Sequence, residues 1–231
     1  MGSKARISKD ILPLILKDRK SNQYYIEPFI GGANTISKVD GKRIGSDINP
    51  YLIILLKSIQ EGYLFPSNIS EEEYKFYKSE RDNGKITPMI AFVGFCSTYG
   101  GRFYEGYARG GFYKDGQPRN YAKERLNNIM KTKEGLQDIL LYNCKYSELE
   151  IPNNSIIYCD PPYQGTKSYK TEKFNNELFF DWCYEMNDKG HQIFLSEYSA
   201  PKDFVCIWEK EVVSSLRTNN NKKAVEKLYK L

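Results

Sequence analysis

Residues 155–163 read SIIYCDPPY and join an apolar stretch to an acidic, proline-rich turn. The first five residues are typical of a short buried strand. Asp160 follows directly, and α/β sheets bind their ligands at the carboxyl ends of the strands. A proline-stiffened turn with a capping aspartate is the structural alternative, although such a tetrapeptide arises by chance in roughly one chain in a thousand of this length. The stretch therefore predicts an α/β fold with a functional acid at position 160.

The chemistry of this turn suits an amino group on an aromatic ring, such as N6 of adenine. That nitrogen is a poor nucleophile because its lone pair is delocalised into the ring. The Asp160 carboxylate and the rigidly held Pro161 carbonyl can accept its two hydrogens and return the lone pair to nitrogen. Tyr163 offers a flat face for an extruded base. We therefore assign catalysis to Asp160, Pro161, Pro162 and Tyr163, with direct transfer and no covalent enzyme intermediate.

A second motif follows the predicted strand at residues 24–27. It reads EPFIGGAN over residues 27–34, and its glycines let the backbone approach a ligand closely. Asp47 ends the next predicted strand, residues 42–46, with the spacing of the carboxylate that accepts ribose hydroxyls in nucleoside-binding α/β folds. Neither GxGxxG nor a Walker A lysine is present in the sequence. The motif therefore favours a nucleoside without phosphate, such as S-adenosylmethionine.

The remaining pattern predicts the domain organisation. The first 60 residues indicate helix, strand, glycine-rich loop, helix, strand and helix, with helices at 7–16 and 50–59. Residues 97–121 are rich in Gly, Tyr and Arg and predict a functional loop. Further helices are expected at 71–81, 89–96 and 122–140, and further strands at 192–195, 204–208 and 225–229. We predict a Rossmann-like methyltransferase sheet (1–60 and 144–231) with an inserted, mainly helical target-recognition domain (61–143).

Composition excludes several other classes of protein. The five cysteines form no CxxC pair, which argues against a metal site or a disulfide framework, and we expect no metal. The only histidine, His191, is expected to be structural, so histidine-dependent nucleophilic catalysis has little basis. No signal peptide or apolar membrane span is evident, and we expect a cytoplasmic protein. A net charge of +5, with 19 tyrosines and 12 phenylalanines, suits a nucleic-acid partner.

With these motifs assembled, the chain resembles the Dam-type, alpha-class DNA adenine N6-methyltransferases. The resemblance covers G-x-K at residues 2–4, the EPFxGxG loop at 27–33, the acidic motif at 46–49, residues 143–148, YCDPPY at 158–163 and the closing segment at 219–229. It implies site-specific methyl transfer from S-adenosylmethionine to N6 of a flipped adenine in duplex DNA. The cofactor contacts it implies are Lys4, Glu27, Phe29, Gly31, Gly32, Asp47, Ile48, Tyr146 and Asp160.

The resemblance is incomplete in two places. Ala33 replaces the last glycine of the cofactor loop, which we expect to tighten the cofactor pocket. Residues 95–104 do not match the recognition sequence of the GATC-methylating members, so GATC specificity is not implied here.

DNA contacts are expected from the insertion and from the segment after DPPY. Arg102 and Arg109 are our candidates for base readout, because arginine pairs bidentately with guanine. Residues 164–174 are predicted to form a mobile cover over the flipped base. The partner is expected to be double-stranded DNA, bound by a monomer or a weak dimer. The full set of predicted DNA contacts comprises Arg102, Tyr104, Tyr107, Arg109, Lys114, Arg119, Lys123, Lys167 and Lys170.

Two alternatives remain open from the residues alone. One is methylation of another planar amine or amide: cytosine N4, RNA, or a protein glutamine. The other is a catalytically silent DNA-binding homologue, against which the intact Asp160, Asp47 and Lys4 argue. Aspartate at the first motif position and the basic, glycine-rich insertion favour adenine in DNA.

Overall fold

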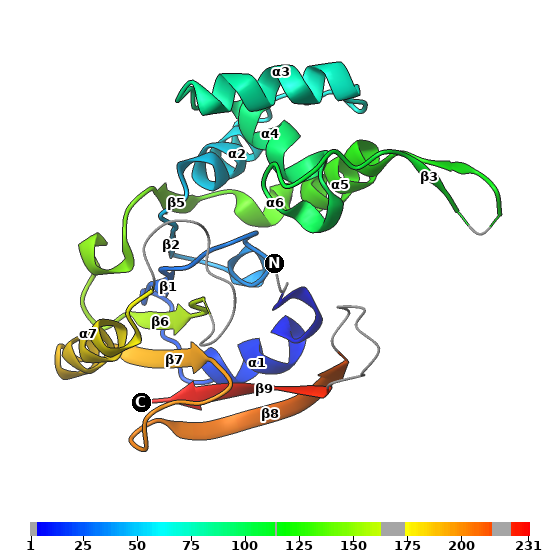
Figure 1. Ribbon diagram of the computed structural model, residues 1–231. Helices are drawn as coiled ribbons and strands as arrows, with labels where there is room; N and C mark the ends of the chain where they lie inside the picture. The colour runs from blue at the N-terminus through cyan, green and yellow to red at the C-terminus, as the bar shows by residue number, and fades with distance from the viewer. Residues whose placement is uncertain (1–3, 114, 163–173, 214–222) are drawn as a thin grey trace.

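The computed structural model describes residues 4–113, 115–162, 174–213 and 223–231, which build a seven-stranded sheet with helices on both faces (Figure 1). The strand order is β5-β2-β1-β6-β7-β9-β8. The first five strands are parallel, and β9 runs antiparallel to β7 and β8. This is the mainly parallel, Rossmann-like α/β sheet that the sequence predicted. Its strands are β1 (Tyr25–Glu27), β2 (Arg43–Ser46), β5 (Ile139–Tyr142), β6 (Ile156–Cys159), β7 (Gln192–Ser196), β8 (Val205–Val213) and β9 (Lys223–Lys230).

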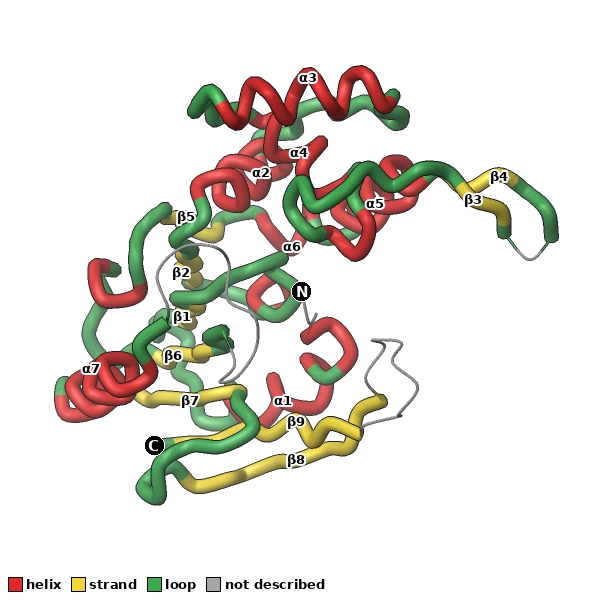
Figure 2. The backbone as a smooth tube through the Cα atoms, in the orientation of Figure 1, coloured by secondary structure: helices red, strands yellow, loops and turns green. Residues whose placement is uncertain are grey.

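The helices form two groups (Figure 2). Helices α1 and α7 flank the sheet, whereas α2 to α6 gather beyond its β5 edge, and a small hairpin of β3 (Gly111–Phe112) and β4 (Pro118–Arg119) projects from that group. The helices are α1 (Ser8–Ile15), α2 (Pro50–Gln60), α3 (Glu71–Asp82), α4 (Pro88–Cys96), α5 (Tyr121–Met130), α6 (Lys133–Leu136) and α7 (Asn176–Asp188). The short 3-10 turns are η1 (Lys4–Arg6), η2 (Ile36–Lys38), η3 (Tyr99–Gly101) and η4 (Tyr146–Glu148). No helix in the described ranges is both long and apolar enough to cross a bilayer.

Local sequence signals explain where three helices of the second group begin. Asn49 caps α2, whose first residue is Pro50. Ser70 and Glu73 form a reciprocal capping box at the start of α3. Thr87 accepts a hydrogen bond from the Ile90 N–H at the start of α4. Each of these helices therefore begins where the chain supplies an acceptor for an otherwise unpaired N–H group.

The alternation of side chains along the strands builds two hydrophobic cores. Tyr25 and Tyr158 face the core that contains α1, whereas Ile26 and Ile157 face the core that contains α7. The first core continues through α2 into Phe92 of α4. The helical insertion therefore packs on the α/β part through one continuous core, and the division of the chain at 60 and 144 stays a prediction.

Two predicted elements need correction. The helix expected over 122–140 ends earlier, because Ile139 and Leu141 are buried while Leu140 and Tyr142 are exposed. This period of two is typical of a strand, and β5 pairs in parallel with β2 inside the range assigned to the insertion. The helix expected between the glycine-rich loop and β2 is only the three-residue turn η2.

The turn between α6 and β5 depends on a close backbone approach. Arg43 of β2 donates hydrogen bonds of 2.6 Å to the carbonyls of Gly135 and Gln137. A Cβ atom on Gly135 would lie 2.0 Å from the Ser37 carbonyl oxygen. Only glycine allows α6 to approach η2 this closely.

We expect Gly135→Ala to lower the free energy of unfolding by about 1–3 kcal/mol, because the added methyl must displace backbone atoms. Urea denaturation measures the change. Gly111→Ala is the matched control, since its Cβ would meet nothing closer than the Tyr121 hydroxyl at 3.9 Å. Equal stability of the two variants would contradict the proposed packing.

Candidate active site

The candidate site lies where the chain changes direction across the sheet. From β1 the chain proceeds outward to β2 and β5, and it then returns to β6 on the other side of β1. The carboxyl ends of β1 and β6 therefore meet at a topological switch point, the usual ligand position in open α/β sheets. Glu27 ends β1 and Asp160 follows β6, so the sheet brings together two motifs that lie far apart in the sequence.

Asp160 forms an ion pair beside this point. Its side chain is 24% exposed, and its Oδ1 lies 3.4 Å from Nζ of Lys4. Lys4 comes from η1 and is buried, and its Nζ lies only 2.6 Å from Oε2 of Glu226 on β9. After Asp160, Pro161 is buried and Pro162 is exposed. The structure thus places Lys4 beside Asp160, and it adds Glu226, which the sequence placed in the closing segment at 219–229 without giving it a role.

A buried polar layer supports the motif from below. The Tyr25 hydroxyl donates to Oε1 of Glu27 at 2.8 Å, and Tyr158 shares a hydrogen bond of 2.7 Å with Ser196. Burial raises the pKa of Glu27 well above its usual range, and the nearby Asp160 raises it further, although the Tyr25 hydrogen bond opposes the shift. This environment therefore favours the protonated form of Glu27 more than solvent does. Period-two spacing places Tyr25 with Glu27, and Tyr158 with Asp160, on one face, which is the sequence signal for this layer.

Asp47 connects the glycine loop to the segment after β2. Its Oδ2 accepts a hydrogen bond of 3.3 Å from the Gly31 N–H, and its Oδ1 accepts one of 2.9 Å from the Asn49 N–H. Burial raises the pKa of Asp47, and these two hydrogen bonds oppose the shift. Gly31 adopts a φ of 49°, in the region that favours glycine. The acid and the loop therefore lie together, and the neighbouring Ile48 is exposed.

An aromatic cluster lies beside this loop. The rings of Phe29 and Tyr146 have centroids 5.4 Å apart, and both contact Phe179 of α7. Phe174 and Trp182 complete the cluster. The sequence indicated Phe29 and Tyr146 but not the three others, although the aromatic spacing at the start of α7 is visible in it. The cluster offers planar surfaces next to the ribose-binding candidate Asp47.

The predicted arginines of the insertion are all paired with acids. Arg109 donates two hydrogen bonds of 3.1 Å to Glu71, and this contact lowers the pKa of that carboxyl to about 2. Arg119 donates two bonds to Glu124, of 3.0 and 2.6 Å. Arg102 forms a looser pair of 3.5 Å with Glu105. The three guanidinium groups are therefore oriented by contacts with glutamates within the protein.

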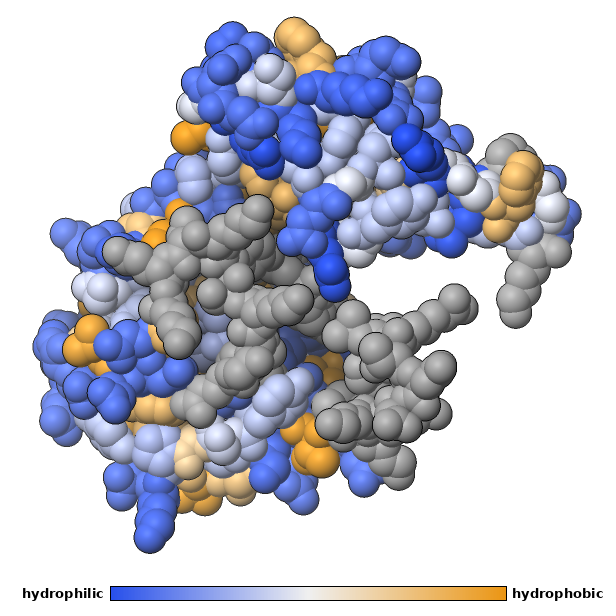
Figure 3. Space-filling model, viewed as in Figure 1, coloured by the Kyte–Doolittle hydropathy of each residue, from blue (hydrophilic) through white to orange (hydrophobic). Residues whose placement is uncertain are grey.

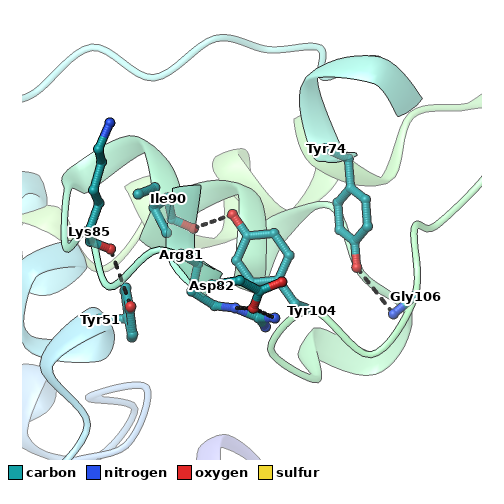
Figure 4. A network of polar contacts seen from close by, with 8 residues as sticks. All are labelled: Tyr51, Tyr74, Arg81, Asp82, Lys85, Ile90, Tyr104 and Gly106. Atoms are coloured by element: carbon teal, nitrogen blue, oxygen red, sulfur yellow. Dashed lines mark hydrogen bonds and ion pairs between the residues drawn. The ribbon is translucent and has the colours of Figure 1, made fainter. Parts of the chain in front are cut away.

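The interpretation of Tyr104 as a DNA contact is wrong (Figure 4). Its side chain is only 4% exposed, and its hydroxyl donates to the Ile90 carbonyl at 2.9 Å. Arg81 lies over its ring, 4.7 Å from the centroid. The glycine-rich composition suggested a surface loop, but the loop folds back onto α3 and α4. Tyr107 is anchored in a similar way, since its hydroxyl donates to the Ile69 carbonyl at 2.7 Å.

The remaining sequence predictions concern His191, a metal site and residues that the structure does not describe. His191 is structural as expected, because its Nδ1 accepts a hydrogen bond of 3.1 Å from the Ser155 N–H, and burial lowers its pKa. Within the described ranges, no cluster of three or more His, Cys, Asp or Glu side chains could hold a metal ion. Several predictions fall outside the described residues: the catalytic Tyr163, the DNA contacts Lys114, Lys167 and Lys170, the cover over 164–173, and parts of the first and last motifs at 2–3 and 219–222.

The raised pKa of Glu27 predicts a pH-dependent stability. The folded state binds the proton more tightly than the unfolded state, so this contribution to stability is complete below the ordinary pKa of 4.5 and is lost as the pH rises toward the folded-state value. Glutamine cannot ionise. As the pH rises above 4.5, the stability of the wild type should fall relative to that of Glu27→Gln, by up to about 1.4 kcal/mol per pH unit. Urea unfolding across this range measures the difference, and parallel curves would contradict the prediction.

Three similar solved structures are methyltransferases, and all three likenesses are distant. The rRNA methyltransferase AviRa from Streptomyces viridochromogenes has a TM-score of 0.44 and 9% identity, with 100% of this chain and 85% of that chain covered. SMU.472, crystallised with SAH, has a TM-score of 0.37 and 12% identity, covering 99% and 53% of the two chains. A class I S-adenosylmethionine-dependent methyltransferase from Listeria monocytogenes has a TM-score of 0.39 and 9% identity, covering 98% and 58%.

The family of the chain is shown by its sequence. No curated protein matches the chain. The model of the D12 class N6 adenine-specific DNA methyltransferases matches residues 1–230. The chain therefore belongs to the family of D12 class N6 adenine-specific DNA methyltransferases, which methylate adenine with S-adenosylmethionine.

Proposed function

We propose that Asp160 and the Pro161 carbonyl accept the two amino hydrogens of an adenine that has been flipped out of duplex DNA. The position of Asp160 at the switch point, between Lys4 and the end of β1, is the observation that supports this assignment. Within the family we propose the Dam-type, alpha-class arrangement, because the glycine loop precedes the insertion and DPPY follows it.

The residues present fit S-adenosylmethionine at the carboxyl edge of the sheet. Each Asp47 oxygen accepts one backbone hydrogen bond, and a carboxylate oxygen has a second lone pair for a ribose hydroxyl. Phe29 and Tyr146 supply planar surface for the adenine ring of the cofactor. Gly31 and Gly32 allow the backbone to approach the cofactor closely. The rest of the cofactor site is bordered by Lys4, Glu27, Ile48 and Asp160. The bound cofactor supplies an electrophilic methyl group carried on a sulfonium.

The protein's part in the reaction is to activate and orient the nucleophile. As Asp160 and Pro161 accept its hydrogens, N6 becomes tetrahedral and its lone pair points at the methyl carbon. The N–C bond forms as the S–C bond breaks, and the sulfur keeps the electron pair. N6 then loses one proton through the Asp160 carboxylate to solvent. Tyr163 is proposed to stack on the base.

DNA is proposed to bind across the insertion and its projecting hairpin. Figure 3 shows that hydrophilic residues dominate the visible face of the helical group, with an apolar spot on the hairpin. Phe112 in β3 is 76% exposed and Tyr113 is 44% exposed. Arg119 lies over the Tyr113 ring at 5.1 Å. The hairpin thus combines planar side chains with cations, which suits bases and phosphates. Arg102 and Arg109 would exchange their glutamates for DNA.

Substitution of Asp160 tests the catalytic assignment. We expect Asp160→Ala to lower methyl transfer from labelled S-adenosylmethionine to mixed-sequence duplex DNA by about a hundredfold or more, because a preorganised acceptor is lost. Nucleoside analysis of the wild-type product should show N6-methyladenine. Wild-type transfer by the variant would sink the assignment, and N4-methylcytosine would point to the alternative substrate.

Substitution of Phe112 tests the role of the hairpin. We expect Phe112→Ala to weaken duplex binding by about tenfold, in the range of one lost stacking contact, while cofactor binding stays unchanged. Fluorescence anisotropy with labelled DNA measures the affinity. Phe76→Ala is the matched control, since Phe76 is also exposed (59%) but lies on α3. Equal DNA affinity of the two variants would contradict the proposed interface.

A further inference from the structure

The ion pair at Asp160 has a third member that comes from the other end of the chain. Nζ of Lys4 lies between two carboxylates, 2.6 Å from Glu226 and 3.4 Å from Asp160. The three side chains are 10%, 18% and 24% exposed, so water screens them less than it screens a surface pair. They come from η1, from β9 and from the turn after β6.

The contacts of Lys4 with these two carboxylates differ in strength. A separation of 2.6 Å is a short, charge-assisted hydrogen bond, and the Lys4 ammonium donates it to Glu226. The separation of 3.4 Å from Asp160 gives electrostatic attraction with weaker hydrogen bonding. Glu226 therefore takes the stronger contact, and Lys4 stabilises the charge of Asp160 from a longer distance.

This difference matters for the reaction. A carboxylate that accepts a short hydrogen bond from an ammonium is a weaker acceptor toward a second, neutral donor such as an adenine amino group. If Lys4 closed onto Asp160, it would compete with the substrate for the same oxygens. If a second carboxylate binds the Lys4 ammonium, the ammonium still attracts the charge of Asp160 but does not take up its oxygens with a short hydrogen bond.

We propose that Glu226 is a positioning residue for methyl transfer, which draws the Lys4 ammonium toward β9 and so prevents it from closing onto Asp160. This inference rests on the proposed role of Asp160 as the acceptor for the adenine amino group. Glu226 itself touches neither substrate in this scheme, and it acts through Lys4.

The test combines single-turnover kinetics with binding. We expect Glu226→Gln to slow methyl transfer about tenfold, as one misplaced charge-assisted hydrogen bond would. Its affinity for S-adenosylmethionine, measured by calorimetry, should change less than about threefold. In a Lys4→Met background, in which we expect slower but measurable transfer, adding Glu226→Gln should lower the rate no further, because the cation that Glu226 restrains is gone.

Glu209→Gln is the matched control. Glu209 lies on β8 of the same hairpin, 3.9 Å from Lys227, and its loss changes the net charge equally away from Asp160. It should keep the wild-type rate.

Several outcomes would overturn the inference: a wild-type rate for Glu226→Gln, equal losses in both Lys4 backgrounds, a loss explained by cofactor affinity, or an inactive Lys4→Met variant, which would give Lys4 a larger part in the reaction than bordering the cofactor and supplying charge beside Asp160. Methyl transfer that survives Asp160→Ala would instead sink the proposed function.

Discussion

The parallel pairing of β1 with β6 is the constraint on which the site depends. Only two residue pairs register these strands, Tyr25 with Ile156 and Ile26 with Ile157, yet they join segments more than a hundred residues apart. The pairing sets the carboxyl end of the glycine-loop strand beside that of the DPPY strand. The helical group leaves the sheet after β2, and the chain then returns through β5 and η4 to this junction. A slip of one residue would turn Tyr158 and Asp160 toward the opposite face.

The same pairing explains why polar groups are buried under the motif. Tyr25, Glu27, Tyr158 and Ser196 lie on adjacent strands of one face and satisfy one another by hydrogen bonds. Burying such groups is costly unless they are paired. We expect an apolar layer at this place to give a more stable fold. The polar layer therefore indicates that stability is lost where a charged ligand is expected to bind. Asp47 follows the same principle, since backbone N–H groups hold both of its oxygens.

Local patterns in the sequence predicted the parts of the fold that short segments determine. The strand before Asp160, the glycine loop and the acid after β2 are each visible within a few residues, and the structure brings all three to one edge. Strand β5 was missed because four residues are too few to separate period two from period 3.6 when a helix precedes them. Tyr104 was misplaced because its burial depends on how a glycine-rich loop packs against α3 and α4. Glu226 lies in the closing segment of the resemblance, but its contact with Lys4 could not be predicted, because the two residues lie at opposite ends of the sequence.

The contact between Lys4 and Glu226 has a consequence for biosynthesis. A ribosome releases Asp160 well before Glu226, at roughly 5–20 residues per second. Until β9 has been synthesised, the Lys4 ammonium has no β9 carboxylate to contact. The site therefore reaches its final arrangement of charges only after β9, the last strand, has been added. A ribosome-bound fragment that ends before β9 contains Lys4 and Asp160 but lacks Glu226.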